Sequence, residues 1–157
     1  MGRRRIESPC VAGVLVLVLA TSCTDVSGPD RVSNVGILEH FESPPRIEVP
    51  TTATVGEPIE VAIETYGELH CILLGETMVR RVDDLRFEIT PLDVFLIPGP
   101  GSACTTRLVV RRHVARIAFD RPGVGRIVVR GRRFSGGFPS QSGVLFEIER
   151  TLTITID

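Results

Sequence analysis

The side chains best suited to chemistry in this sequence are a few cysteines and histidines. His70 directly precedes Cys71, and His113 lies nine residues after Cys104. Two thiols and two imidazoles are the ligand types of a zinc site, so these four residues are a candidate site for a metal ion or a small ligand. Their spacing lacks the C-x-x-C and H-x-x-x-H clusters of strong zinc motifs, and also the C-x-x-C of thiol oxidoreductases. We therefore keep this site as the alternative and expect no metal and no cofactor.

The sequence contains no convincing catalytic constellation. A relay of His113 with Asp120 or Asp93 is conceivable, but a histidine in an arginine-flanked strand is typical of a solvated position. The adjacent pair Asp83 and Asp84 precedes a strand without a calcium-loop pattern, which indicates a turn. No G-x-S-x-G motif, P-loop or dinucleotide fingerprint is present. We predict that the protein is not an enzyme and has no catalytic residues.

The first 22 residues have the order of a secretory signal. Three arginines at positions 3–5 precede an apolar run at 11–20, and the small polar residues Thr21 and Ser22 follow. The apolar run is too short to span a bilayer, which takes about 20 residues. We therefore predict that residues 1–22 are a signal peptide and that the protein is exported.

The end of this segment, Leu19-Ala20-Thr21-Ser22-Cys23, resembles the lipobox of bacterial lipoproteins. The resemblance implies cleavage before Cys23 and attachment of acyl chains such as palmitate to it, so that the membrane is a partner through the lipid. Ala20 departs from the leucine that the family prefers. Thr24 follows the cysteine where an aspartate would retain the protein in the inner membrane, which implies the outer membrane. A conventional signal cleavage after Ser22, leaving Cys23 as a thiol, is the alternative.

The rest of the chain divides by composition into a tether and a domain. Residues 23–45 are polar, apart from a short apolar patch at 35–38, and we predict a lipidated cysteine followed by a tether. The folded domain is expected over residues 46–157.

Charge is divided unevenly along the chain. Residues 24–100 hold 5 arginines and 14 acidic residues, whereas residues 101–157 hold 10 arginines and 4 acidic residues. We expect these charges to pair across neighbouring strands, and a basic face for a phosphate-bearing envelope polymer is the alternative. The formal net charge of −1 argues against nucleic acid as a partner.

Beyond residue 46 apolar and polar residues alternate with a period of two. The segments at 59–65, 85–90 and 146–156 show it most clearly, and turn signals separate shorter β-rich stretches. This pattern predicts an all-β fold, an antiparallel sandwich or barrel of about seven strands. The segments at 49–58 and 120–129 resemble a first strand with its turn and an E-to-F corner of bacterial immunoglobulin-like domains. The resemblance implies an immunoglobulin-like β-sandwich without the core tryptophan and the disulfide position of antibody domains.

Two cysteines remain in the predicted domain once Cys10 is lost with the signal and Cys23 carries a lipid. Because the protein is expected in an oxidising compartment, Cys71 and Cys104 are predicted to form a disulfide. The immunoglobulin-like layout implies the same pairing, since it places the two at adjacent ends of strands B and E.

The segment 130–143 is the most suggestive surface feature, because it would join the last two strands. Its candidate binding residues are Arg130, Arg132, Arg133, Phe134 and Phe138. Arginine forks suit phosphate or carboxylate, and the phenylalanines suit apolar anchoring, although a loop folded back on the core fits equally. The sequence thus predicts a membrane-anchored envelope lipoprotein that acts as a non-catalytic binding or structural module, with an unidentified envelope protein or polymer as partner.

Overall fold

The computed structural model describes residues 30–41, 43–97, 99, 103–104, 107–134 and 143–156. Ten strands form within them: β1 (Asp30–Val35), β2 (Ile37–Glu39), β3 (Ile47–Glu48), β4 (Thr52–Thr54), β5 (Ile59–Glu68), β6 (Ile72–Asp83), β7 (Arg86–Ile97), β8 (Leu108–Ile117), β9 (Gly123–Phe134) and β10 (Gly143–Thr155). In this part of the chain there is no helix of the length and apolarity needed to cross a membrane. The prediction of an all-β fold is confirmed.

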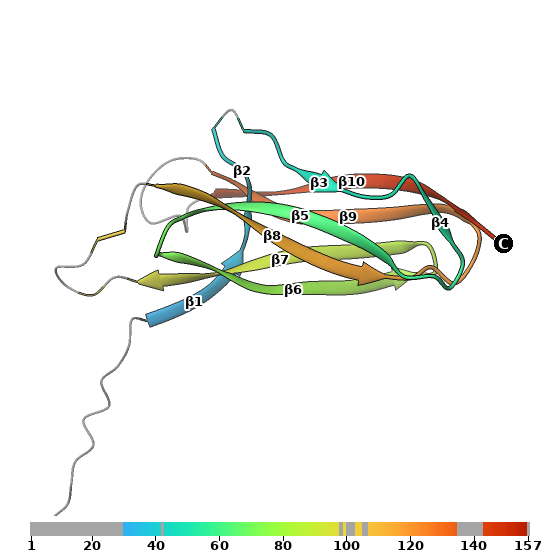
Figure 1. The fold of residues 1–157 in the computed structure, drawn as a ribbon, viewed down its shortest axis with the longest axis horizontal. Coiled ribbons are helices and arrows are strands. Elements are labelled where there is room, and N and C mark those ends of the chain that lie inside the picture. Colours follow the sequence, from blue (N-terminus) through green and yellow to red (C-terminus); the bar gives the residue numbers. More distant parts are fainter. Residues whose placement is uncertain are drawn as a thin grey trace, which may run out of the picture.

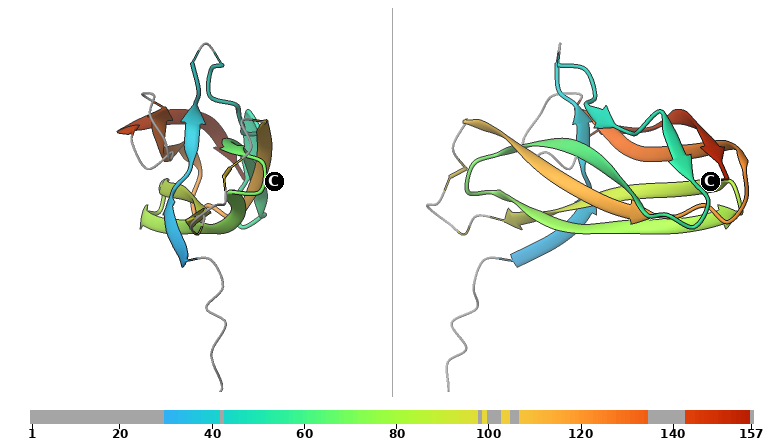
Figure 2. Two further views of the ribbon diagram at one scale, coloured as in Figure 1. Left: turned by 90° about the vertical axis from the view of Figure 1, so that its left-hand side faces the viewer. Right: turned by 45° about the vertical axis from the view of Figure 1, so that its right-hand side comes forward.

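The strands belong to one curled sheet (Figures 1 and 2). Its main path runs β1-β7-β9-β2-β5-β3; β6 pairs with β7, β8 with β5, and β10 with both β9 and β4. The short β2 joins the two halves, because it pairs in parallel with β9 and antiparallel with β5. The result is a half-barrel whose interior lies between β5 and β8 on one side and β6, β7, β9 and β10 on the other.

This topology differs from the predicted seven-stranded immunoglobulin-like sandwich. The β5–β8 pair does join the segments expected as strands B and E, and the β9–β10 pair joins the last two strands of the chain. However, the next strand along the chain, β6, is 12 residues long and forms an antiparallel hairpin with β7. β7 then pairs in parallel with β9. The side chain of Asp83 supports this hairpin by accepting a 2.8 Å hydrogen bond from the Leu85 amide, as expected for a turn.

Residues 30–39 belong to the folded domain, which corrects the tether predicted over residues 23–45. β1 pairs with β7 along its whole length, and β2 inserts between β9 and β5. Ile37 and Leu38 are 2% and 0% exposed, so the apolar patch noted in the sequence is part of the interior. Gly36 links the two strands where a Cβ atom would lie 2.5 Å from the Thr65 methyl group, so only glycine fits there without displacement of its neighbours.

One end of the half-barrel is filled by an apolar core. Phe119 lies at its centre in edge-to-face contact with Phe87, with the ring centroids 5.2 Å apart. Buried side chains from seven strands surround this pair, among them Val61, Ile89, Ala115, Ile127, Leu152 and Ile154. Most of these residues alternate with polar neighbours along their strands, which is why the period-two pattern predicted the strands.

The predicted disulfide between Cys71 and Cys104 is confirmed. It joins the residue before β6 to the loop before β8, with the Cα atoms 5.5 Å apart.

Replacing both Cys71 and Cys104 with serine should lower the free energy of unfolding by about 3 to 4 kcal/mol, because the bond closes a 33-residue separation. Urea unfolding with and without reductant measures this. Reductant should destabilise the wild-type protein by a similar amount and leave the double variant unchanged; equal stability of the oxidised wild type and the variant would contradict the prediction.

Candidate functional site

The end of the interior nearest the disulfide is polar, in contrast to the apolar core. Four polar side chains there are at most 3% exposed: Thr65 on β5, Asp93 on β7, His113 on β8 and Arg132 on β9. Strand alternation places them inside the sheet together with apolar neighbours, so that four different strands contribute one buried polar residue each. We call this group the polar cluster.

His113 connects three strands through its two ring nitrogens. Its Nε2 lies 3.1 Å from Asp93 Oδ1, and its Nδ1 lies 3.1 Å from the hydroxyl oxygen of Thr77 on β6. With an ionised Asp93, the Nε2–H group of a neutral His113 ring donates a hydrogen bond to the carboxylate. Nδ1 then accepts a hydrogen bond from the Thr77 hydroxyl. The order hydroxyl, imidazole and carboxylate is that of an acid–base relay.

The expectation that His113 is solvated is therefore wrong. Its side chain is 1% exposed, as is that of Asp93. The alternation of His113 with Ala115 and Ile117 along β8 places all three on the interior face. The imidazole and the carboxylate are closed off from solvent, and their hydrogen bonds hold β6, β7 and β8 together.

Two arginines complete the electrostatics of the polar cluster. Burial lowers the pKa of Arg132 and that of Arg111 from their usual values, and in each case the negative charge of Asp93 opposes the shift. Arg132 donates from Nε to the Val35 carbonyl at 2.8 Å, and its guanidinium lies 5.3 Å from the centre of the Phe95 ring. The Asp93 carboxylate thus interacts electrostatically with two guanidinium groups and is hydrogen-bonded to the His113 imidazole.

β6 and β8 are linked by side chains where backbone pairing is missing. Among the described residues no ladder joins these two strands. Three side-chain links occur instead, in the same order along both segments: the Cys71–Cys104 disulfide, the Thr77–His113 hydrogen bond and the Arg81–Asp120 ion pair. The half-barrel is therefore closed along this line by side chains alone.

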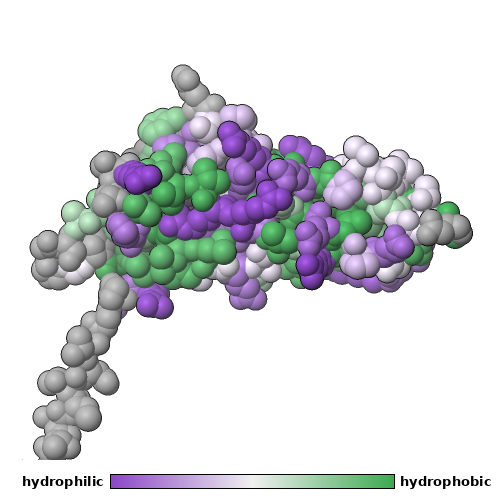
Figure 3. All heavy atoms as spheres, in the orientation of Figure 1, coloured by the Kyte–Doolittle hydropathy of each residue, from purple (hydrophilic) through white to green (hydrophobic). Residues whose placement is uncertain are grey.

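Large apolar side chains are exposed along these two strands, and we call them the apolar strip. They are Leu73, Leu74, Met78, Val79 and Val82 on β6 and Leu108, Val110 and Val114 on β8, each 38% to 54% exposed. Figure 3 shows hydrophobic patches in the area where the two strands run in Figure 1. Exposed apolar patches of this kind occur at interaction sites.

The candidate binding residues near the last hairpin do not form one surface. Arg132 is buried, so its prediction as a surface contact is wrong. Arg130 pairs with Glu147 at 2.7 Å, and Arg133 pairs with Glu39 at 2.7 Å. Phe134 stacks on His40 with the ring centroids 4.6 Å apart. Phe138 lies outside the described residues.

His40 belongs to a small aromatic group with Phe41, Tyr66 and Phe134. Burial lowers its pKa from 6.5. Because the unfolded chain then binds the proton more readily than the folded protein, stability should fall as the pH drops below about 6.5.

A His40→Phe variant keeps the stacking but removes the titration. Urea midpoints at pH 7.5 and pH 5.5 should therefore differ less for this variant than for the wild type. An identical decrease in both proteins would show that His40 has no part in the pH dependence.

The alternative metal site is not assembled. Cys71 and Cys104 are bonded to each other, and His113 is held by Asp93 and Thr77. His70 is exposed, at a turn with φ of 72°. Within the part of the chain that the structure describes, no three histidine, cysteine or acidic side chains are grouped as metal ligands.

The expected pairing of charges across strands is confirmed. Arg112 pairs with Glu48 and Arg116 with Glu60, which joins the basic second part of the chain to the acidic first part. The Arg112 guanidinium lowers the pKa of Glu48 from its usual value. These pairs are exposed, so each contributes little to stability.

Comparisons with protein-family models, with characterised proteins and with solved structures give no match for this chain.

Proposed function

We propose that this protein is an exported, lipid-anchored component of the bacterial cell envelope that binds a partner protein through the apolar strip and catalyses no reaction. The observation that carries the binding role is the exposure of eight large apolar side chains on β6 and β8. Exposed large apolar side chains offer a partner surface area that is buried on binding.

Export is supported by the disulfide and by the first 23 residues. Structural disulfides persist in oxidising compartments and are rare in the cytosol. The charged, apolar and small-residue segments before Cys23, which resemble a lipoprotein signal, agree with that compartment. We propose that the lipid on Cys23 holds the protein in the membrane, in the outer membrane where the host has one.

A non-catalytic role is supported by the burial of the one relay in the described residues. The imidazole of His113 and the carboxylate of Asp93 have 1% of their side-chain surface exposed. General acid–base catalysis needs a hydrogen bond between such a group and its substrate.

Anchoring is tested with a palmitate analogue fed to cells that express the full chain. The wild-type protein and a Cys10→Ser variant should both take up the label, because Cys10 lies in the segment removed before lipid attachment. A Cys23→Ser variant should take up none. Labelling of Cys23→Ser, or no labelling of the wild type, would disprove the anchor.

The binding role is tested by a photo-crosslinking amino acid placed at Val114 on the apolar strip. Val124 is the matched control, because it is an equally small apolar residue, 59% exposed, at the start of β9. We expect a defined adduct with another envelope protein from position 114 and none from position 124. No adduct at 114, or the same adducts at both positions, would contradict a binding role for the strip.

A further inference from the structure

Six residues separate the proposed lipid site, Cys23, from the folded domain. β1 begins at Asp30, so residues 24–29 are the whole connection between the lipid and the sheet. The seven residue steps from Cys23 to Asp30 span at most about 25 Å when fully extended. A 12-residue strand such as β7 is about 40 Å long. The connection is therefore shorter than the domain, and it determines which end of the domain lies near the membrane.

Asp30 lies at the disulfide end of the half-barrel. It is paired with Ile97, the last residue of β7. The amide of the neighbouring Leu96 donates a 2.7 Å hydrogen bond to the Cys71 carbonyl, and the disulfide joins Cys71 to Cys104. β1, β6, β7 and β8 thus all have one terminus at this end, on the left in Figure 1, and β9 begins at the opposite end.

We infer that the disulfide end contacts the lipid surface of the membrane that holds Cys23, through Val32, Ile97 and Leu108. These three apolar side chains lie close to the start of β1, the end of β7 and the start of β8, and they are 39% to 41% exposed. Apolar side chains held next to a bilayer bury their surface at its interface, which favours this orientation. The inference rests on the lipid anchor of the proposed function and adds the orientation of the domain on the membrane.

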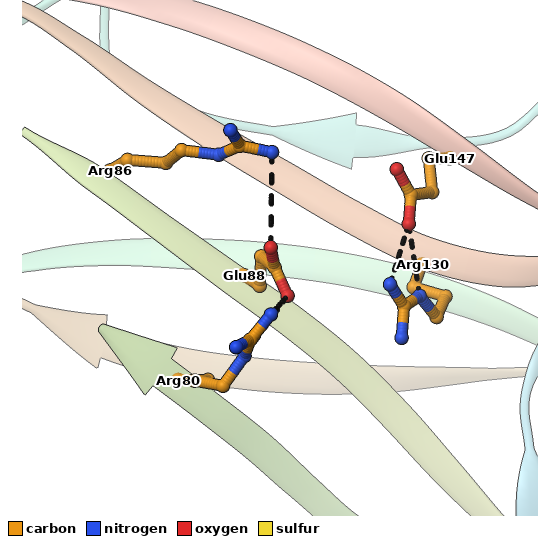
Figure 4. Close-up of polar contacts among 5 residues, drawn as sticks. All are labelled: Arg80, Arg86, Glu88, Arg130 and Glu147. Atoms are coloured by element: carbon orange, nitrogen blue, oxygen red, sulfur yellow. Dashed lines mark hydrogen bonds and ion pairs between the residues drawn. The ribbon is translucent and has the colours of Figure 1, made fainter. Parts of the chain in front are cut away.

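Two arginines at the same end suit the phosphate groups of lipids. Arg31 and Arg107 are exposed, and the described residues give neither of them an ion pair. Several arginines in the middle of the sheet are paired with glutamates instead, as Figure 4 shows for Arg80, Arg86 and Arg130. Because a guanidinium binds phosphate through a planar fork of donors, Arg31 and Arg107 extend the contact to the lipid headgroups.

This orientation also determines how the apolar strip lies relative to the membrane. β6 and β8 both run from the disulfide end toward the opposite end of the half-barrel (Figure 1). The strip therefore begins near the bilayer at Leu108 and runs away from it toward Val82 and Val114. The membrane takes the end of the strip at Leu108, and the residues farther along both strands stay available to the partner protein.

The first test uses the full-length lipoprotein in vesicles of phosphatidylethanolamine and phosphatidylglycerol. A photo-crosslinking amino acid replaces Ile97 or, as the matched control, Val124, which is 59% exposed at the start of β9. We expect a lipid adduct, detected by mass, from position 97 and none from position 124. No adduct from position 97 would overturn the inference. Equal adducts from both positions, the result for a domain that lies flat on the bilayer, would also overturn it.

The outcome is separate from the test of the anchor. The vesicles are loaded only with protein whose mass shows acyl chains on Cys23, so a missing lipid adduct contradicts the inference while the anchor stands. The same photo-crosslinking amino acid at Val32 should give the same lipid adduct, so a folding defect in one variant does not decide the result. The partner test uses position 114, and it can fail independently of both.

Charge reversal tests the contact with lipid phosphates. With the photo-crosslinking amino acid at position 97, Arg31→Glu and Arg107→Glu should each lower the yield of lipid adduct by about fivefold in these vesicles. Arg126→Glu is the matched control, because Arg126 is exposed near the start of β9, and it should leave the yield unchanged. Equal yields from the three variants, with folding confirmed by circular dichroism, would exclude the contact of these arginines with the headgroups.

Discussion

Replacing Asp93 with alanine is expected to lower the free energy of unfolding by about 3 to 5 kcal/mol, the range found when one partner of a buried charged pair is removed. The carboxylate accepts the hydrogen bond from His113 Nε2, and its charge opposes the desolvation of Arg111 and Arg132. Without it the imidazole loses an acceptor at a site that water does not reach. Urea unfolding at neutral pH measures the loss.

Two further variants make this result interpretable. Asp93→Asn keeps an oxygen that accepts from His113 but loses the negative charge, so its loss of stability should lie between those of the wild type and Asp93→Ala. Asp84→Ala removes an exposed carboxylate that pairs with Arg81, and it should have a much smaller effect. A loss of less than about 1 kcal/mol for Asp93→Ala would mean that the polar cluster does not depend on this carboxylate.

Replacing Phe119 with alanine is expected to cost about 3 to 5 kcal/mol at the other end of the interior. Its ring is 1% exposed and packs edge-to-face on Phe87, so truncation leaves a cavity in the apolar core. Phe41→Ala is the matched control, because Phe41 is 72% exposed and its loss leaves no cavity. Equal effects of the two substitutions on the urea midpoint would contradict the assignment of the core.

The two substitutions act on different parts of one interior. The polar cluster lies where β1 and β2 cross between the halves of the sheet, and the apolar core lies where β4 and β10 cover it. In a double variant the losses from Asp93→Ala and Phe119→Ala should nearly add, as they do for separated sites.

The parts of the fold that local pattern determines were predictable from the sequence. Alternation along β7 and β10 revealed strands, because one face of each is more buried than the other. The alternation of residue types in β5 also predicted a strand, although β5 is buried on both faces over residues 61–63 and 65–67. The disulfide followed from the count of cysteines left in an exported domain. The strands at residues 30–39 were missed because a polar composition outweighed a short apolar signal, although Ile37 and Leu38 carried it.

Pairings between distant segments were not predictable in the same way. Nothing local indicates that β7 rather than β6 pairs with β9, because that choice depends on the whole sheet. The polar cluster was not predicted, because the conceivable relay of His113 with Asp93 was set aside on the ground that a histidine in an arginine-flanked strand is typical of a solvated position. The sequence of β8 did indicate the burial of His113. His113, Ala115 and Ile117 are alternate residues of one strand, so all three lie on the same, buried face.

Export and lipid anchoring are tested most directly by the intact mass of the protein extracted from its own membrane, measured with and without reductant. A disulfide-linked, lipid-anchored protein should lack residues 1–22, carry the mass of acyl chains on the peptide that begins with Cys23, and gain about two mass units on reduction. A mass without acyl chains, or a mass that reductant does not change, would contradict the account of an exported and membrane-anchored binding module.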